Sequence, residues 1–379
     1  MKRTGNLWEH IVAYENLLTA YRKARRGKRR RRVVEQFEFR RELELVILQQ
    51  ELSDNTYQPG GYDTFMLYDT KARMISAAPF RDRVVHHALC NVIEPIFEQT
   101  FIHDSYASRA GRGTHAAIRR YQQFAREYNW VLKCDVRQFF PSIDHQILKQ
   151  RVARKIKDPR VLALVATIID HSNAQASVPG FFPGDDLFTA NERRRGLPIG
   201  NQTSQFFGNV FLDALDHFVK EVLGCPAYIR YVDDFVLLGN DKGELADMRD
   251  AIEQFLISLR LWLHPKKRVI SRTQDGVRFL GFRVWPNRIW FCGNSIRRVR
   301  RRVRQMQEEF ARGISSLEQI RQRINAWNGH AAMVTGTRYR SRLLHDMIFC
   351  RTVTESLRSG GLLEQQCKEH PLLEPEQER

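Results

Sequence analysis

Two adjacent aspartates, Asp233 and Asp234, are the residues of this chain best suited to chemistry. They interrupt segment 229–238, whose β-branched and aromatic residues predict a strand, a tight turn and a second strand. Two carboxylates ~4 Å apart repel each other by on the order of 4 kcal/mol at an effective dielectric constant of ~20. A divalent cation that prefers oxygen ligands, such as Mg²⁺, removes this repulsion. A bare Asp-Asp pair is more often a solvated surface turn, so a metal site requires a further carboxylate.

A third carboxylate, Asp135, ends another apolar segment that starts at Trp130. One aspartate from one strand and two from a neighbouring hairpin can hold two metal ions, which activate an attacking 3′-hydroxyl group and stabilise the leaving pyrophosphate. Five residues after Asp135, the ring of Phe140 would press against the sugar of an incoming nucleotide and exclude a 2′-hydroxyl group. The alternative for Phe139 and Phe140 is core packing. Because adjacent strand residues face opposite ways, we expect one of these rings to be core.

The order of these residues resembles that of the reverse transcriptases. Seven segments follow the order of that family's motifs and cover about residues 60 to 285. They are two fingers segments at 73–85 and 104–117, the first palm segment at 135–140, the template-holding segment at 197–205, the metal-binding hairpin at 231–234, the lysine-bearing segment at 261–267 and the primer grip at 278–283. The resemblance implies an α+β right-hand polymerase with fingers, an antiparallel palm sheet and a helical thumb.

The resemblance also implies roles for individual residues. Asp135, Asp233 and Asp234 would hold two Mg²⁺ ions, for which Mn²⁺ can substitute. Lys267 would protonate the leaving pyrophosphate, with Lys266 as the alternative donor. The residues expected to bind the nucleotide are Arg73, Lys71 (which could equally be a solvated hairpin lysine), Arg109, Phe140, Ile199, Gly200 and Gln205, and those expected in the primer grip are Phe279, Leu280 and Gly281.

The sequence of the template-holding segment indicates which group of reverse transcriptases the chain resembles. Group II intron enzymes usually read Gln-Gly-x-x-x-Ser-Pro there, whereas this chain reads Ile-Gly-Asn-Gln-Thr-Ser-Gln at 199–205. This variant, with segments 7–28 and 326–331, resembles reverse transcriptases of diversity-generating retroelements. In that family the enzyme copies a template-repeat RNA into cDNA with errors at adenine during mutagenic retrohoming, and a small accessory variability-determinant protein oligomer assists it. The implied partners are template RNA, the RNA/cDNA duplex, dNTPs and that accessory protein.

Other functions stay open. One is another prokaryotic reverse transcriptase of the group II intron, CRISPR-associated or phage-defence type. A second is a non-catalytic, maturase-like RNA-binding protein, against which the three intact aspartates argue.

The aliphatic side chain of Ile199 cannot make the hydrogen bond that a glutamine could make beside the nascent base pair. The enzyme is therefore expected to have lower fidelity. The alternative is that Ile199 only contributes to packing and that fidelity is set elsewhere.

The charge of the chain indicates a polyanionic partner. The 61 Lys and Arg residues exceed the 43 Asp and Glu residues, for a net charge of +18. Nine of the eleven residues at 22–32 are Arg or Lys, and an apolar stripe at 296–310 is flanked by further arginines. Both clusters could instead be solvated surface charge. The residues expected to bind nucleic acid are Arg25, Arg26, Arg29, Arg30, Arg297, Arg301 and Arg304.

The pattern along the chain predicts helices at 7–21 and 35–52, and a helix that begins after an N-cap at Ser295. The expected organisation is a basic helical extension (1–55), fingers (56–129), palm (130–285, with a loop insertion near 172–190), thumb (286–355) and an acidic, disordered tail (356–379). Six widely spaced cysteines and the lack of a long apolar run favour a cytoplasmic protein with no membrane partner. The resemblance implies a bacterial or phage origin.

Overall fold

The computed structural model describes residues 3–68, 72–172, 180–186, 188–336, 341 and 347–349. Lys71, the acidic tail at 356–379 and part of the loop at 172–190 lie outside the described residues. The chain divides into two compact units, one ending at Asp275 and the other beginning at Gly276. The division into five functional parts stays a prediction.

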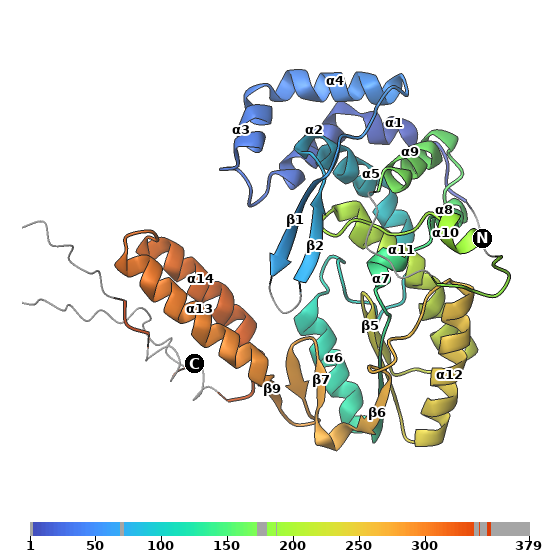
Figure 1. Ribbon diagram of the computed structural model, residues 1–379, viewed down its shortest axis with the longest axis vertical. Helices are drawn as coiled ribbons and strands as arrows, with labels where there is room; N and C mark the ends of the chain where they lie inside the picture. The colour runs from blue at the N-terminus through green and yellow to red at the C-terminus, as the bar shows by residue number, and fades with distance from the viewer. Residues whose placement is uncertain are drawn as a thin grey trace, which may run out of the picture. The chain divides into compact units, whose positions relative to one another are not determined.

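The helices within the first 100 residues gather in one layer of the first unit (Figure 1). The two helices expected at 7–21 and 35–52 are each broken. The first breaks at Ala13, where ψ is 132°, and the second at Arg40, where φ is −113° and ψ is 22°. Three of the resulting helices, α1, α2 and α3, pack on a long central helix, α5, and α4 packs on these three helices, all within a shared apolar core. These elements are α1 (Trp8–Val12), α2 (Tyr14–Ala24), α3 (Arg32–Phe39), α4 (Arg41–Ser53) and α5 (Phe80–Glu98).

A separate two-stranded ribbon precedes α5. Its strands, β1 (Asp63–Tyr68) and β2 (Ala72–Ala77), pair antiparallel with Asp63 opposite Ala77. All six side chains of β1 are exposed, whereas Ser76 of β2 is buried. The ribbon is therefore anchored mainly at the end of β2 that leads into α5.

The core of the first unit is a four-stranded antiparallel sheet in the order β4-β5-β3-β6. Its central strands are rich in buried Val, Leu and Phe, residue types that pack well on a pleated surface. The α+β class with an antiparallel sheet is confirmed. The strands are β3 (Trp130–Asp135), β4 (Tyr228–Tyr231), β5 (Asp234–Gly239) and β6 (Val269–Arg272).

Helices complete this unit. Helix α12 packs on β3, β5 and β6, α6 packs on β4, and α11 packs on α5 and α8 (Figure 1). The chain after Asp135 does not continue as a strand, because Gln138 is left-handed (φ 46°) and starts a short helix. The elements are α6 (Thr114–Glu127), α7 (Phe139–Ser142), α8 (His145–Ala153), α9 (Pro159–Asp170), α10 (Thr189–Glu192), α11 (Gln202–His217), the π-helix η1 (Phe218–Val222), α12 (Lys242–Ser258) and the 3₁₀-helix η2 (Thr273–Asp275).

The second unit combines a three-stranded antiparallel sheet with two helices. Its strands are β7 (Val277–Phe279), β8 (Phe282–Val284) and β9 (Ile289–Phe291), and its helices are α13 (Gly293–Ala311) and α14 (Leu317–Ala331). The apolar stripe expected on α13 is confirmed, since Met306 and Phe310 pack against Ile320 and Ile324. The expected N-cap was wrong: α13 is preceded by Cys292, and the Ser295 hydroxyl donates to the Gly281 carbonyl oxygen at 3.2 Å.

In the part of the chain that the structure describes, every helix is too short or too polar to span a lipid bilayer.

Candidate active site

The hairpin between β4 and β5 turns at its acidic pair. Tyr231 pairs with Asp234, so Val232 and Asp233 form the two-residue loop. Val232 has a φ of 57°, a left-handed conformation that is unfavourable for a β-branched residue. Strained backbone of this kind persists only where surrounding contacts hold it, and it is concentrated at functional sites.

The sheet register brings the three aspartates together. Asp135, the last residue of β3, lies directly opposite Asp234, the first residue of β5. The backbone N–H of Val136 donates to the Asp233 carbonyl oxygen at 3.1 Å, which ties the hairpin tip to the end of β3. Asp135 thus lies next to the Asp233-Asp234 pair, as expected, although the role of the three aspartates stays a prediction.

Two lysines bind these carboxylates. Lys267 donates to Asp135 Oδ2 at 2.7 Å, and Lys133 donates to Asp234 Oδ2 at 3.1 Å. Lys266 is exposed, so Lys267 is the lysine of this pair that reaches the aspartates. Sequence reasoning missed Lys133. The signal was its position two residues before Asp135, which places both side chains on the same face of one strand.

The electrostatics of the three aspartates favour a cation. Burial and then the charge of Asp135 raise the pKa of Asp233 to about 6. Burial also raises the pKa of Asp234, which Lys133 opposes. The Oδ1 atom of Asp234 is buried and has no hydrogen-bond partner. An unsatisfied carboxylate oxygen beside two further carboxylates fits a hard divalent cation.

The carboxylates are not preassembled as a metal cage. Among the described residues, no three or more His, Cys, Asp or Glu side chains are gathered closely enough to hold a metal ion as they stand. Lysine ammonium groups occupy one oxygen each of Asp135 and Asp234. Cation binding would therefore require these lysines to give up their present contacts.

Phe139 and Phe140 have different environments, as expected. The reason is not the alternation of side chains along a strand, because these residues are helical. Both lie in α7, where the Phe139 side chain is buried and the Phe140 side chain is half-buried. Gly208 of α11 lies under both rings, and a Cβ atom there would be 3.2 Å from Phe139 Cε1 and 3.3 Å from Phe140 Cε1. The Leu197 N–H donates to the Phe140 carbonyl oxygen at 2.9 Å, which joins α7 to the segment that leads to Ile199.

The segment at 199–205 lies against β2. The Ser76 N–H donates to the Ile199 carbonyl oxygen at 3.0 Å. Gly200 has a φ of 124°, and a Cβ atom there would be 3.1 Å from Ile75 Cγ2, so glycine suits both its conformation and its close approach. Gln205 is exposed and accepts a hydrogen bond from the Ser108 hydroxyl at 2.8 Å. Arg73 is exposed on β2, where it pairs with Leu67.

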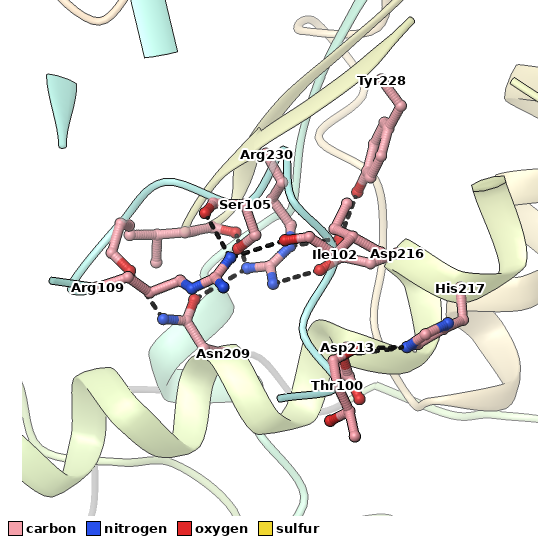
Figure 2. A network of polar contacts seen from close by, with 12 residues as sticks. Thr100, Ile102, Ser105, Arg109, Asn209, Asp213, Asp216, His217, Tyr228 and Arg230 are labelled. Carbon is pink, nitrogen blue, oxygen red and sulfur yellow. Dashed lines mark hydrogen bonds and ion pairs between the residues drawn. The ribbon is translucent and has the colours of Figure 1, made fainter. Parts of the chain in front are cut away.

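Arg109 is engaged within the protein. Its guanidinium group binds Glu98. It also donates to the carbonyl oxygens of Ile102 and Ser105 at 2.7 and 2.8 Å (Figure 2). Its side chain is only 5% exposed. Its expected nucleotide contact stays a prediction, and such a contact would require the guanidinium group to give up some of these bonds.

The basic segment at 22–32 is mostly exposed. Arg26, Arg29 and Arg30 have exposed side chains. Arg25 differs, because it binds Glu38 and the Tyr21 hydroxyl. Its charge is therefore already partnered within the protein.

In the second unit, Phe279 is fully buried and belongs to the core. Leu280 and Gly281 form the loop between β7 and β8, and the φ of both is positive, as in a type I′ turn. Any primer contact at this hairpin would come from its loop rather than from the Phe279 ring. On α13, the side chains of Arg297, Arg301 and Arg304 are exposed.

Sequence reasoning also missed a fully buried arginine, Arg230, one residue before Tyr231. Its guanidinium group binds both carboxylate oxygens of Asp216 at 2.6 Å (Figure 2). The only local signal was a charged residue inside an apolar strand, and its partner lies on α11, 14 residues away in sequence.

Comparison with known proteins places the chain in a family. The profile of the family described as reverse transcriptase (RNA-dependent DNA polymerase) matches residues 66–284. Protein YkfC of Escherichia coli K12 is 28% identical over 282 residues, 64% of this chain and 71% of YkfC. The group II intron-encoded protein LtrA of Lactococcus lactis is 21% identical over 303 residues, 62% of this chain and 48% of LtrA. The chain thus spans about half the length of LtrA.

Among solved structures, apo telomerase from Candida tropicalis is similar, with a TM-score of 0.48, 12% sequence identity, and coverage of 79% of this chain and 66% of that one. The family match covers more than half of the chain and includes all three aspartates. The chain belongs to the reverse transcriptase family of RNA-dependent DNA polymerases, with the right-hand polymerase fold of that family.

Proposed function

We propose that this chain extends a DNA primer on an RNA template with dNTPs, and that Asp135, Asp233 and Asp234 form its catalytic centre. One observation carries the proposal. The ends of β3 and β5 place Asp135 opposite Asp234 with Asp233 at the adjoining tip, and one Asp234 oxygen is buried without a partner. Carboxylates at the adjoining ends of two strands repel one another, and a divalent cation bound between them would remove this repulsion.

The residues that would hold two divalent cations, Mg²⁺ with Mn²⁺ as a substitute, are Asp135, Asp233 and Asp234. When bound, such ions supply activation of the primer 3′-hydroxyl group and charge stabilisation at the leaving pyrophosphate. Lys267 holds its ammonium group 2.7 Å from Asp135 Oδ2. Once that oxygen is engaged elsewhere, the ammonium group is free to donate a proton to the departing pyrophosphate.

Selection of the sugar would depend on Phe140. Its ring is half-buried and supported from beneath by Gly208 and Phe139. A ring held in this way resists displacement by a 2′-hydroxyl group, which favours dNTPs over rNTPs. Arg73, exposed on β2, is available to the triphosphate.

Primer extension on a defined RNA template tests this function. We expect incorporation by the unaltered chain and none by Asp135→Asn, because that substitution removes a carboxylate charge while it keeps the size of the side chain. Asp250→Asn is the matched control, because Asp250 is an exposed aspartate of α12 that pairs with Arg249. Equal loss in both variants, or no loss in Asp135→Asn, would contradict the assignment.

We further propose that the enzyme serves a diversity-generating retroelement in the cytoplasm of its host, copying a template-repeat RNA with errors at adenine. The sequence at 199–205 supports this, because Ile199 replaces the glutamine typical of group II intron enzymes. The Ile199 side chain is half-buried and its backbone is fixed to Ser76, so its position is defined. A small accessory protein oligomer would assist the reaction.

Sequencing of cDNA from a defined RNA template tests the retroelement proposal. Errors concentrated at template adenines would support it. Errors that are equally rare at all four template bases would refute it and leave a general reverse transcriptase.

A further inference from the structure

The buried arginine of the catalytic hairpin, Arg230, joins three parts of the first unit. Its Nε and Nη2 atoms donate to the two carboxylate oxygens of Asp216 at 2.6 Å, and its Nη1 atom donates to Asn209 Oδ1 at 3.1 Å. Both partners lie on α11 (Figure 2). The same Nη1 atom donates to the Val232 carbonyl oxygen at 3.1 Å. A fully buried guanidinium group thus connects a rigid helix to the loop that carries Asp233.

The contact with Val232 falls at the strained position of the loop. Val232 has a φ of 57°, which a β-branched residue adopts only under constraint. Its carbonyl group belongs to the peptide that precedes Asp233, so the hydrogen bond from Arg230 fixes the orientation of that peptide. On the other side of Asp233, its own carbonyl oxygen accepts from the Val136 N–H at 3.1 Å. Asp233 is therefore held on both sides.

The support itself is fixed from several directions. The Arg230 N–H donates to the Asp104 carbonyl oxygen, and the Arg230 carbonyl oxygen accepts from the Tyr106 N–H, both at 3.0 Å. Asn209 Nδ2 donates to the Ala107 carbonyl oxygen at 2.8 Å. These bonds hold the arginine against movement along the strand, as a group that positions another residue requires.

We propose that Arg230, fixed by Asp216 and Asn209, is a positioning residue that holds the Val232 peptide and thereby aims the Asp233 carboxylate at the catalytic centre. This inference rests on the proposed polymerase function. Arg230 is fully buried and therefore out of reach of a substrate, so its contribution is to geometry. Arginine is required because lysine cannot bind a carboxylate with two parallel hydrogen bonds and reach a third acceptor as well.

The test compares two changes in this network. The double variant Arg230→Met with Asp216→Asn removes the link to Val232 and leaves no unpaired buried charge, so the fold is kept. The control is Tyr228→Phe, because the Tyr228 hydroxyl donates to the same Asp216 at 2.8 Å but has no hydrogen bond to the hairpin loop. Thermal unfolding and filter binding to the RNA/DNA primer–template report on fold and substrate binding.

We expect the double variant to lose kcat by about 100-fold, the effect of misplacing a catalytic group by roughly an ångström. The KM for primer–template should not change. Binding of Mn²⁺ measured by electron paramagnetic resonance should weaken by about tenfold, as for other groups that orient a metal ligand. Tyr228→Phe should leave kcat and Mn²⁺ binding unchanged.

Adding Val232→Gly to the double variant separates positioning from general stability. Glycine adopts a positive φ without steric cost, so the loop regains its conformation without the arginine and part of the lost kcat returns. If Tyr228→Phe lowers kcat as much as the double variant does, or if Val232→Gly restores nothing, the inference is overturned. If the unaltered chain itself incorporates no dNTP, the proposed function fails instead.

Discussion

The sharpest test of how the nucleotide site is built concerns Gly208, the α11 residue beneath Phe139 and Phe140. In Gly208→Ala the new Cβ atom would be 3.2 Å from Phe139 Cε1 and 3.3 Å from Phe140 Cε1. Both distances are shorter than ordinary van der Waals contact, so one ring must move. Phe139 is 2% exposed and enclosed by core, so we expect the half-buried Phe140 ring to move outward.

The expected change in the free energy of unfolding combines two opposing effects. Overpacking a core costs about 1–3 kcal/mol, and glycine-to-alanine replacement inside a helix returns about 0.5–1 kcal/mol. We therefore expect a net loss of about 1 kcal/mol, measured by urea unfolding. Gly329→Ala is the matched control, because Gly329 lies in α14 and a Cβ atom added there would meet nothing within 4 Å, so this variant should gain about 0.5–1 kcal/mol.

The same displacement should alter catalysis. A Phe140 ring pushed toward the sugar should raise the KM for dNTPs several-fold, with binding of primer–template unchanged. In a Phe140→Ala background, Gly208→Ala should cost less, because one of the two crowded rings is gone. If Gly208→Ala is as stable as Gly329→Ala and its KM for dNTPs equals that of the unaltered chain, Gly208 does not set the position of the Phe140 ring.

Three further outcomes follow from the charges and burial described above. Neutralising Arg297, Arg301 and Arg304 should flatten the dependence of log affinity for structured RNA on log salt by about 0.7–0.9 per phosphate contact, and an unchanged slope in filter binding would show that these arginines are only solvated. Ile199→Gln should lower errors by about tenfold if one hydrogen bond worth ~1–2 kcal/mol is restored beside the nascent pair, and an unchanged cDNA error rate would show that Ile199 only packs. Burial lowers the pKa of His86 from 6.5 to about 3, so the unfolded chain binds more protons below pH 6.5 and stability falls as pH falls. The part of this loss due to His86 should be about 2 kcal/mol between pH 7 and pH 5, so His86→Leu should lose about 2 kcal/mol less than the unaltered chain does, and equal losses in urea unfolding at the two pH values would contradict this.

Local patterns predicted the strands and the acidic hairpin well. Apolar runs ending in Asp135 and broken by Asp233 and Asp234 predict strand ends, because a charged residue is tolerated where a buried strand emerges. The apolar stripe on α13 was also predicted correctly, because apolar residues three and four positions apart lie on one face of a helix. This face packs against a second helix, α14. In both cases the information lies within a few residues of sequence.

The features that sequence reasoning missed depend on distant partners. Arg230 is buried because Asp216 on α11 neutralises it, and nothing near Arg230 in sequence indicates that pairing. Lys133 on β3 forms an ion pair with Asp234 on the neighbouring strand β5, and Arg109 forms one with Glu98 on α5. Helix interruptions such as that at Arg40 were missed for a related reason, since tertiary packing rather than propensity sets where the chain turns.

Single-turnover incorporation of one dNTP by Asp233→Asn tests whether the three aspartates at the end of the sheet form the polymerase centre. Asp233 lies at the tip of the hairpin and its carboxyl group has a raised pKa because of burial and the charge of Asp135. We predict that incorporation is abolished while RNA binding and thermal stability are retained, because only a charge at the metal site is lost. Incorporation by Asp233→Asn at a rate near that of the unaltered chain would contradict the account.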